Sequence, residues 1–82
     1  MIKVCFFASL REQLQCSELV LNDFAEGSVD ELLLHLKRHH PDWSDALSQP
    51  KLLSAINHSM VARTAAIKEN DEVAFFPMVT GG

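Results

Sequence analysis

Short apolar runs alternate with polar segments along the chain, and most of these runs have the two-residue period of a β-strand. Residues 2–7 are rich in β-branched and aromatic side chains; Ile2, Val4 and Phe6 share one face of the predicted strand, and Phe7 lies on the other. The same kind of pattern predicts further strands at 18–22, 52–57, 60–63 and 72–76.

The clearest helix follows Ser28. Ser28 as N-cap and Glu31 at the third helical position form a capping box, and Pro41 is expected to end the helix. An apolar stripe at i, i+3, i+4 and i+7 predicts one side that faces the core. The residues of this stripe are Val29, Leu32, Leu33 and Leu36.

A shorter helix is predicted between the first two strands. Ser9 would be its N-cap, Glu12 would complete a second capping box, and the helix would run to about residue 15. It would bury Leu10 and Leu14, a pair four residues apart. One more helical turn is expected at 43–47.

The predicted order is strand, short helix, strand, long helix, two short strands and a final strand. A mixed sheet with the long helix packed across one face satisfies this burial pattern. We therefore expect an α+β fold of the β-grasp, or ubiquitin-like, type over residues 1–77, followed by an extended tail at 78–82.

Composition and charge exclude several classes of function. A length of 82 residues indicates one domain. The net charge of −4 and the scattered basic residues argue against a nucleic-acid binder, which needs cations to neutralise phosphates. The apolar runs are far shorter than the roughly 20 residues that cross a bilayer, and no signal-peptide pattern is present. Cys5 and Cys16 lack metal-finger spacing, which favours a reduced, cytoplasmic protein.

The sequence indicates no internal active site. Gly27, Gly81 and Gly82 form no phosphate-binding loop, and no Ser or Cys has a His at a recognisable nucleophile spacing. His35 and His39 have the spacing of a helical metal pair, but the pattern shows no third ligand beside them. We therefore predict no metal site and no cofactor bound by this chain.

The last residues are a candidate reactive tail. Pro77 lacks a backbone donor and is expected to end the pairing of the final strand, so that 78–80 lead away from the sheet. Two final glycines without Cβ atoms could enter a narrow channel. A carboxylate on Gly82 would be ionised at neutral pH, so a separate enzyme must activate it before a sulfur can attack. The residues expected to insert into another active site are Pro77, Met78, Val79, Thr80 and Gly81.

This ending carries a family resemblance. Asp-Glu-Val-Ala-Phe-Phe-Pro at 71–77 and Val-Thr-Gly-Gly at 79–82 closely resemble the C-terminus of the small, sulfur-carrier subunit of molybdopterin synthase. Family members often carry a second proline where this chain has Met78. Segments similar to the family's first strand, first helix and central hairpin are Ile-Lys-Val at 2–4, Phe-Phe-Ala at 6–8, Arg-Glu at 11–12 and Lys-Leu-Leu at 51–53.

The resemblance implies a non-catalytic sulfur donor within a sulfurtransferase complex. A ubiquitin-activating-type adenylyltransferase would use ATP and magnesium to adenylate Gly82, which then becomes a thiocarboxylate. Inside the large synthase subunit, the thiocarboxylate would give its sulfur to cyclic pyranopterin monophosphate, and two transfers would build the molybdopterin dithiolene. The resemblance further implies a heterotetramer of two small and two large subunits, with no nucleic-acid or membrane partner.

Side-chain alternation also predicts a docking surface. If Phe6 and Phe75 face the helix, Phe7 and Phe76 face outward on the open side of the sheet, and Met60 joins them if its strand pairs as expected. Such an exposed patch beside the tail would suit both partners in turn. The alternative is that loops or the short helix cover these side chains.

Other functions fit parts of the same pattern. A ubiquitin-like sulfur carrier for thiamine synthesis or tRNA thiolation would share the fold and the Gly82 chemistry but use another acceptor. A protein modifier would form isopeptide bonds to lysines instead. An interaction domain with an inert tail would not need Gly82.

Overall fold

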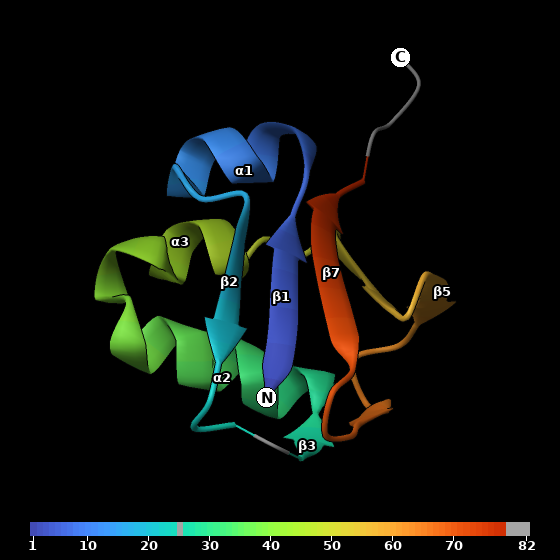
Figure 1. The fold of residues 1–82 in the computed structure, drawn as a ribbon. Helices are drawn as coiled ribbons and strands as arrows, with labels where there is room; N and C mark the ends of the chain where they lie inside the picture. The colour runs from blue at the N-terminus through green and yellow to red at the C-terminus, as the bar shows by residue number, and fades with distance from the viewer. Residues whose placement is uncertain (25, 79–82) are drawn as a thin grey trace.

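The computed structural model describes residues 1–24 and 26–78 as a mixed sheet with helices on one side (Figure 1). Its main sheet has the strand order β2-β1-β7-β4-β5, in which β1 and β7 are parallel and the other neighbours antiparallel. The elements are β1 (Ile2–Phe6), α1 (Ala8–Leu14), β2 (Glu18–Leu21), β3 (Gly27–Ser28), α2 (Val29–His39), the 3-10 turn η1 (Pro41–Trp43), α3 (Ser44–Leu47), β4 (Leu52–Ile56), β5 (Ser59–Val61), β6 (Ala66–Ile67) and β7 (Glu72–Pro77).

The long helix α2 forms as the sequence predicts. Ser28 Oγ accepts a hydrogen bond from the Glu31 N–H at 3.1 Å, and the Glu31 carboxylate accepts one from the Ser28 N–H at 2.9 Å. The helix ends at His39, two residues before Pro41. The residues of its predicted core stripe, Val29, Leu32, Leu33 and Leu36, are all buried. None of the helices in the described residues is long and apolar enough to cross a membrane.

The start of α1 differs from the prediction. Phe7, not Ser9, is the N-cap, and no side chain caps the helix, so the predicted capping box is absent. The Phe7 N–H donates to the Phe75 carbonyl at 3.1 Å, and Ala8 then turns the chain with a φ of 55°. Because the chain leaves the sheet immediately after this bond, the helix begins before Ser9 can cap it. The buried residues of α1 are the predicted pair, Leu10 and Leu14.

The inner face of the sheet holds the centre of the core. Phe6 and Phe75 lie side by side on parallel strands, with ring centroids 6.3 Å apart, and both are fully buried. The predicted helical turn at 43–47 is present as η1 and α3. It brings the Trp43 ring edge-on to Phe6 at 5.5 Å. Aromatic contact therefore joins the sheet to the helical layer.

Pro77 does not end sheet pairing as predicted. It lies opposite Leu52 within β7, and the N–H of Met78 still donates to the Lys51 carbonyl at 3.1 Å. Successive N–H groups along a strand point to opposite sides, so the donor that Pro77 lacks would face β1. Because β1 ends at Phe6, no ladder bond is lost there.

Two turns at the other end of β7 are joined by side chains. Asn57 and His58 have φ of 50° and 72°, which suits a two-residue hairpin turn between β4 and β5. Asn57 Nδ2 donates to Asp71 Oδ1 at 2.9 Å, while Asn57 Oδ1 accepts from the Glu72 N–H at 3.0 Å. Asp71 Oδ2 accepts from the Lys68 N–H at 2.8 Å. That backbone donor, followed by Asn57, lowers the pKa of Asp71.

The short strands β3 and β6 are absent from the sequence prediction. They pair with Gly27 opposite Ile67 and Ser28 opposite Ala66. Gly27 has a φ of 149°, and a Cβ there would lie 3.0 Å from Cζ of Phe24. A glycine is therefore needed at the point where the loop after β2 turns into α2.

Candidate functional site on the outer face of the sheet

Two predicted docking residues lie next to each other on the outer face of the sheet. The parallel register pairs Phe6 with Phe75, which places Phe7 beside Phe76 where β1 and β7 end. Phe7 is 48% exposed and Phe76 is half-buried. Neither α1 nor a loop covers Phe7, so the predicted aromatic surface is open at this point.

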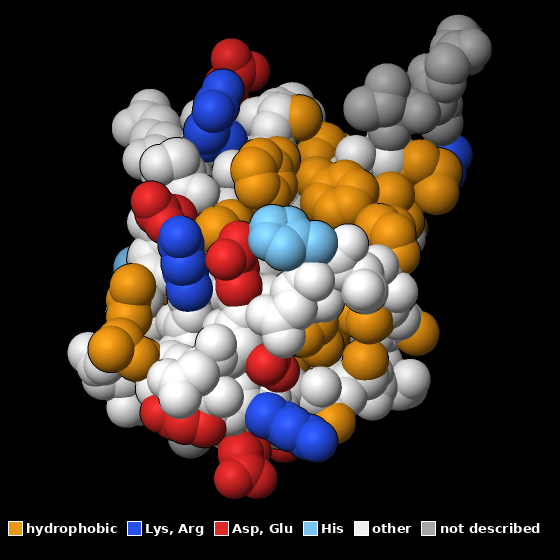
Figure 2. All heavy atoms as spheres, turned by 45° about the vertical axis from the view of Figure 1, so that its right-hand side comes forward, with side chains coloured by type: hydrophobic (Ala, Val, Ile, Leu, Met, Phe, Trp, Pro, Cys, Tyr) orange, Lys and Arg blue, Asp and Glu red, His pale blue; other side chains and the backbone are white. Residues whose placement is uncertain are grey.

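The third predicted residue, Met60, lies farther from β7. It pairs with Ala55 on β4, and Ala55 in turn pairs with Ala74 on β7, so two strand spacings of roughly 4.8 Å separate Met60 from β7. Met60 is 58% exposed. Leu53, which pairs with Phe76, lies on β4, the strand between β5 and β7. Figure 2 shows hydrophobic side chains gathered over the upper part of this side of the molecule.

We name this surface the outer apolar patch and define it by its residues. They are Phe7, Leu53, Ala55, Met60, Ala74 and Phe76. Sequence reasoning named Phe7, Met60 and Phe76 as docking residues, and alternation along the last strand places Ala74 on the face of Phe76. Leu53 and Ala55 were missed, because the register of β4 against β7 decides which β4 side chains face outward.

Polar and charged side chains lie on the other half of the same face. Lys3 Nζ lies 3.2 Å from Glu18 Oε2, and this hydrogen-bonded pair raises the pKa of Lys3. Cys5 is 7% exposed, and its Sγ lies 3.8 Å from Glu72 Oε2. Burial, with the negative charge of Glu72, raises the pKa of the Cys5 thiol. The two large aromatic side chains of this face, Phe7 and Phe76, thus lie at the end of the sheet where β7 finishes, whereas Val20 is an exposed apolar side chain in the other half.

The predicted tail residues lie mostly outside the described part of the chain. Val79, Thr80, Gly81 and the predicted reactive residue Gly82 are all beyond Met78, the last residue that the structure describes. Pro77 is half-buried in β7, and Met78 is 45% exposed. The chain therefore leaves the sheet at the end that carries Phe7 and Phe76.

The fold adds a third side chain to the histidine pair that the sequence analysis considered. Asp23, in the loop after β2, lies beside His35 and His39 of α2. The histidine spacing is visible in the sequence, whereas the position of Asp23 follows from the path of the loop. The described residues enclose no pocket.

Comparison with known proteins places the chain in a family. The model of the ThiS family matches residues 4–82. The chain belongs to the ThiS family. Two curated relatives are the molybdopterin synthase sulfur carrier subunits of Haemophilus influenzae and Escherichia coli, 41% and 42% identical over 83 residues. Each alignment covers 100% of this chain and 100% of the relative.

The fold agrees with this membership of the ThiS family. The chain is similar to the solution structure of small archaeal modifier protein 1 from Methanosarcina acetivorans, with a TM-score of 0.74 and 27% sequence identity. The alignment covers 99% of this chain and 95% of that chain. The β-grasp fold predicted from the order of strands and helices is confirmed.

Proposed function

We propose that this chain is the sulfur carrier subunit of a molybdopterin synthase, with the sulfur carried on Gly82. Full-length identity of 41% and 42% to two relatives that bear this name is the observation that carries the proposal. The outer apolar patch supports it, because a carrier needs a surface for its partners near the residues that they act on. The patch lies beside Pro77 and Met78, which lead to Gly82.

The chemistry assigned to Gly82 requires two steps outside this chain. A carboxylate is ionised at neutral pH, with an ordinary terminal pKa of about 3.3–3.7, and is a poor electrophile in that form. An adenylyltransferase of the ubiquitin-activating type attaches AMP from ATP with magnesium and releases pyrophosphate. A sulfur nucleophile then displaces AMP and leaves a thiocarboxylate. This chain supplies the reacting group, and ATP and magnesium are used by the activating partner.

The loaded carrier then meets the large synthase subunit. Gly82 delivers its sulfur to cyclic pyranopterin monophosphate in that subunit, and two deliveries complete the dithiolene of molybdopterin. Residues 77–81 extend into the partner, while Phe7, Met60 and Phe76 bind its surface. The assembly is a heterotetramer of two carriers and two large subunits. It works in the cytoplasm, an assignment supported by the free thiols of Cys5 and Cys16.

Mass spectrometry combined with reconstitution tests this function. After incubation with the adenylyltransferase, ATP, magnesium and a sulfur source, the intact chain should gain the mass difference between one sulfur and one oxygen. The purified product should then convert the pterin precursor when the large subunit is added. A chain lacking Gly82 should fold but neither gain sulfur nor support conversion. Conversion by that truncated chain would overturn the assignment.

A protein modifier is the alternative with a specific observation behind it. The similar fold from Methanosarcina acetivorans belongs to a small archaeal modifier protein. The same incubation, supplemented with a cell extract, separates the two functions. Covalent conjugates much heavier than the chain would identify a modifier. Sulfur gain followed by transfer to a thiamine or tRNA precursor, with none to the pterin, would identify another kind of sulfur carrier.

A further inference from the structure

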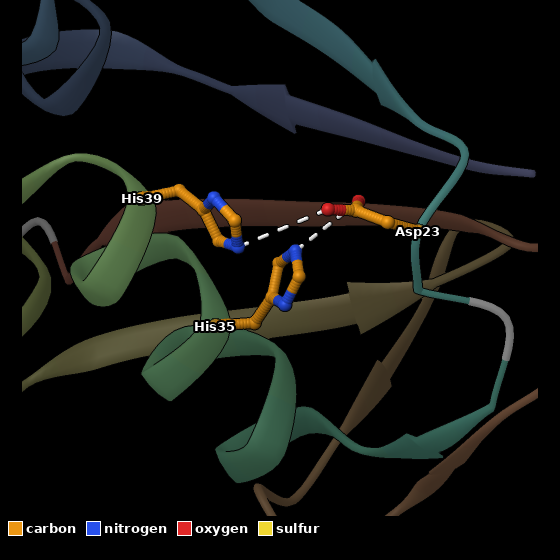
Figure 3. A group of neighbouring side chains, drawn as sticks. All are labelled: Asp23, His35 and His39. Carbon is orange, nitrogen blue, oxygen red and sulfur yellow. Dashed lines mark hydrogen bonds and ion pairs between the residues drawn. The ribbon is translucent and has the colours of Figure 1, made fainter.

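Three potential metal ligands converge where the loop after β2 meets the second half of α2 (Figure 3). His35 Nε2 lies 3.3 Å from Asp23 Oδ1, and His39 Nε2 lies 3.8 Å from Asp23 Oδ2. One ligand atom from each residue lies within 4.8 Å of those from the other two. Both imidazole Nε2 atoms are therefore directed at the same carboxylate.

The backbone places these side chains near one another, and packing holds one of them, His35. His35 and His39 are one helical turn apart on α2, so they occupy the same flank of the helix. The side chain of His35 is only 19% exposed, and its ring lies 5.5 Å from the ring of Phe24. Phe24 itself lies close to Gly27 at the start of α2. Packing therefore positions His35, whereas the side chains of Asp23 and His39 are 60% and 57% exposed.

We propose that Asp23, His35 and His39 bind a divalent metal ion, and that zinc is the ion they suit best. Zinc binds imidazole nitrogen at about 2.0–2.1 Å and carboxylate oxygen at about 2.0–2.2 Å, usually with tetrahedral geometry. Those bond lengths place neighbouring ligand atoms about 3.3 Å apart. The distance from His35 Nε2 to Asp23 Oδ1 matches this value, whereas His39 Nε2 lies 3.8 Å from the other carboxylate oxygen, Oδ2. Binding one ion through a single oxygen therefore requires the side chains to rotate toward one another.

A simple histidine–aspartate ion pair explains the geometry less well. N–H···O hydrogen bonds have their usual separation near 2.9–3.0 Å, and charge-assisted ones are about 2.7–2.9 Å. His35 makes a long hydrogen bond to Asp23 at 3.3 Å, and His39, at 3.8 Å, lies beyond hydrogen-bond distance of the carboxylate. The two rings are also only 4.3 Å apart between centroids, so one ion can be within reach of both imidazoles.

The site is separate from the proposed path of the sulfur. The loop after β2 lies at the opposite end of the sheet from the end of β7, because β2 is antiparallel to β1 and β1 is parallel to β7 (Figure 1). Three protein ligands leave at least one position for water or an external ligand. A bound ion would join the loop to α2 and stabilise the folded chain by an amount that grows with the logarithm of the ion concentration once the site is filled.

Metal binding to the full-length chain, free of any affinity tag, tests the site. Isothermal titration with zinc should give one saturable equivalent per chain, and zinc should raise the melting temperature. Cobalt should give the visible absorption of a nitrogen- and oxygen-ligated ion, without the intense near-ultraviolet band of a thiolate ligand. His39→Gln and Asp23→Asn should each weaken zinc binding by at least about tenfold, since even loss of an outer-shell partner often costs that much.

His58→Gln is the matched control, because His58 is exposed in the β4–β5 turn and belongs to another part of the fold. It should bind zinc like the unaltered chain. Circular dichroism of every variant in metal-free buffer checks that folding is retained. The site is excluded by absence of saturable zinc binding, by unchanged binding in Asp23→Asn and His39→Gln, or by an equal loss in His58→Gln.

Discussion

The two faces of the sheet carry similar apolar side chains but bury them to different extents. Phe75 points inward and is fully buried beside Phe6, whereas its neighbour Phe76 points outward and is half-buried beside the exposed Phe7. The helical layer, with Trp43, covers the inner face, whereas side chains of the outer apolar patch stay partly accessible. Residues of the same type therefore stabilise the core on one face and, in the proposed function, bind partners on the other.

The largest expected effect tests the inner face. Phe75→Ala should lower the free energy of unfolding by about 3–5 kcal/mol, because it removes a buried ring and leaves a cavity. Urea denaturation followed by circular dichroism measures this loss. Phe76→Ala, one residue away, is the matched control and should cost less than about 1 kcal/mol. Equal losses of unfolding free energy in the two variants would contradict the difference between the two faces.

The second prediction tests the outer face. Phe76→Ala should weaken binding to the large synthase subunit by about 30-fold, the effect of losing an interface residue worth about 2 kcal/mol. Surface plasmon resonance or titration calorimetry gives the affinity. Val20→Ala is the control, because Val20 is 51% exposed on the same face and pairs with Lys3, away from the outer apolar patch. Unchanged affinity of the Phe76→Ala variant for the large subunit would exclude Phe76 as a docking residue.

The third prediction concerns the strand register, which keeps the two faces distinct. A slip of one residue would exchange the faces, and the Asn57–Asp71 contacts hold β4 against β7. Asp71→Ala should lower the free energy of unfolding at pH 7 by about 1 kcal/mol, because it removes two hydrogen bonds at a partly exposed site. Glu12→Ala makes the same change in charge on the exposed side of α1 and should have little effect.

The same variant has a defined pH dependence. The fold lowers the pKa of Asp71 below its ordinary value of 3.8, so the unfolded chain binds the proton more tightly. The stability from Asp71 is therefore present above that ordinary value and is lost as the pH falls through the folded pKa. The difference between Asp71→Ala and the unaltered chain should shrink below about pH 4. A difference that grows on acidification would contradict this role.

The smallest effect concerns the two thiols. Cys5 is buried on the outer face and its pKa is raised, whereas Cys16 is half-exposed. Iodoacetamide should modify Cys5 at least about tenfold more slowly than Cys16, because both access and thiolate content limit the reaction. Peptide mapping of the labelled chain gives both rates. Faster labelling of Cys5 would show that the polar half of the outer face is open.

Local patterns predicted most of the fold, and contacts between distant segments account for the rest. The capping box of α2 lies within four residues, so Ser28 and Glu31 reveal it directly. The strands β3 and β6 have two residues each and exist only through pairing between Gly27 and Ile67, which leaves no periodic signal. Ser9 fails as a cap because a bond from Phe7 to distant Phe75 sets the start of α1.

In the candidate sites too, local patterns predicted some residues and contacts between distant segments account for the others. Alternation along β1 and β7 was enough to place Phe7 and Phe76 on the outer face, whereas Leu53 required the register of β4 against β7. The four-residue spacing predicted that His35 and His39 share a helix flank. Asp23 comes from a loop 12 residues before His35, and no spacing rule reports where such a loop lies. Gly82 was assigned from its sequence context and remains a prediction about residues outside the described range.

The position of β7 has a mechanical consequence. The strand is hydrogen-bonded to β1 on one side and to β4 on the other, and Met78 adds one more bond to Lys51. Tension applied to the chain beyond Met78 runs along the strand and strains many of these bonds at once, whereas tension at the free edge of a sheet would open them one by one. A partner can therefore pull on the chain at this end repeatedly without unfolding the domain.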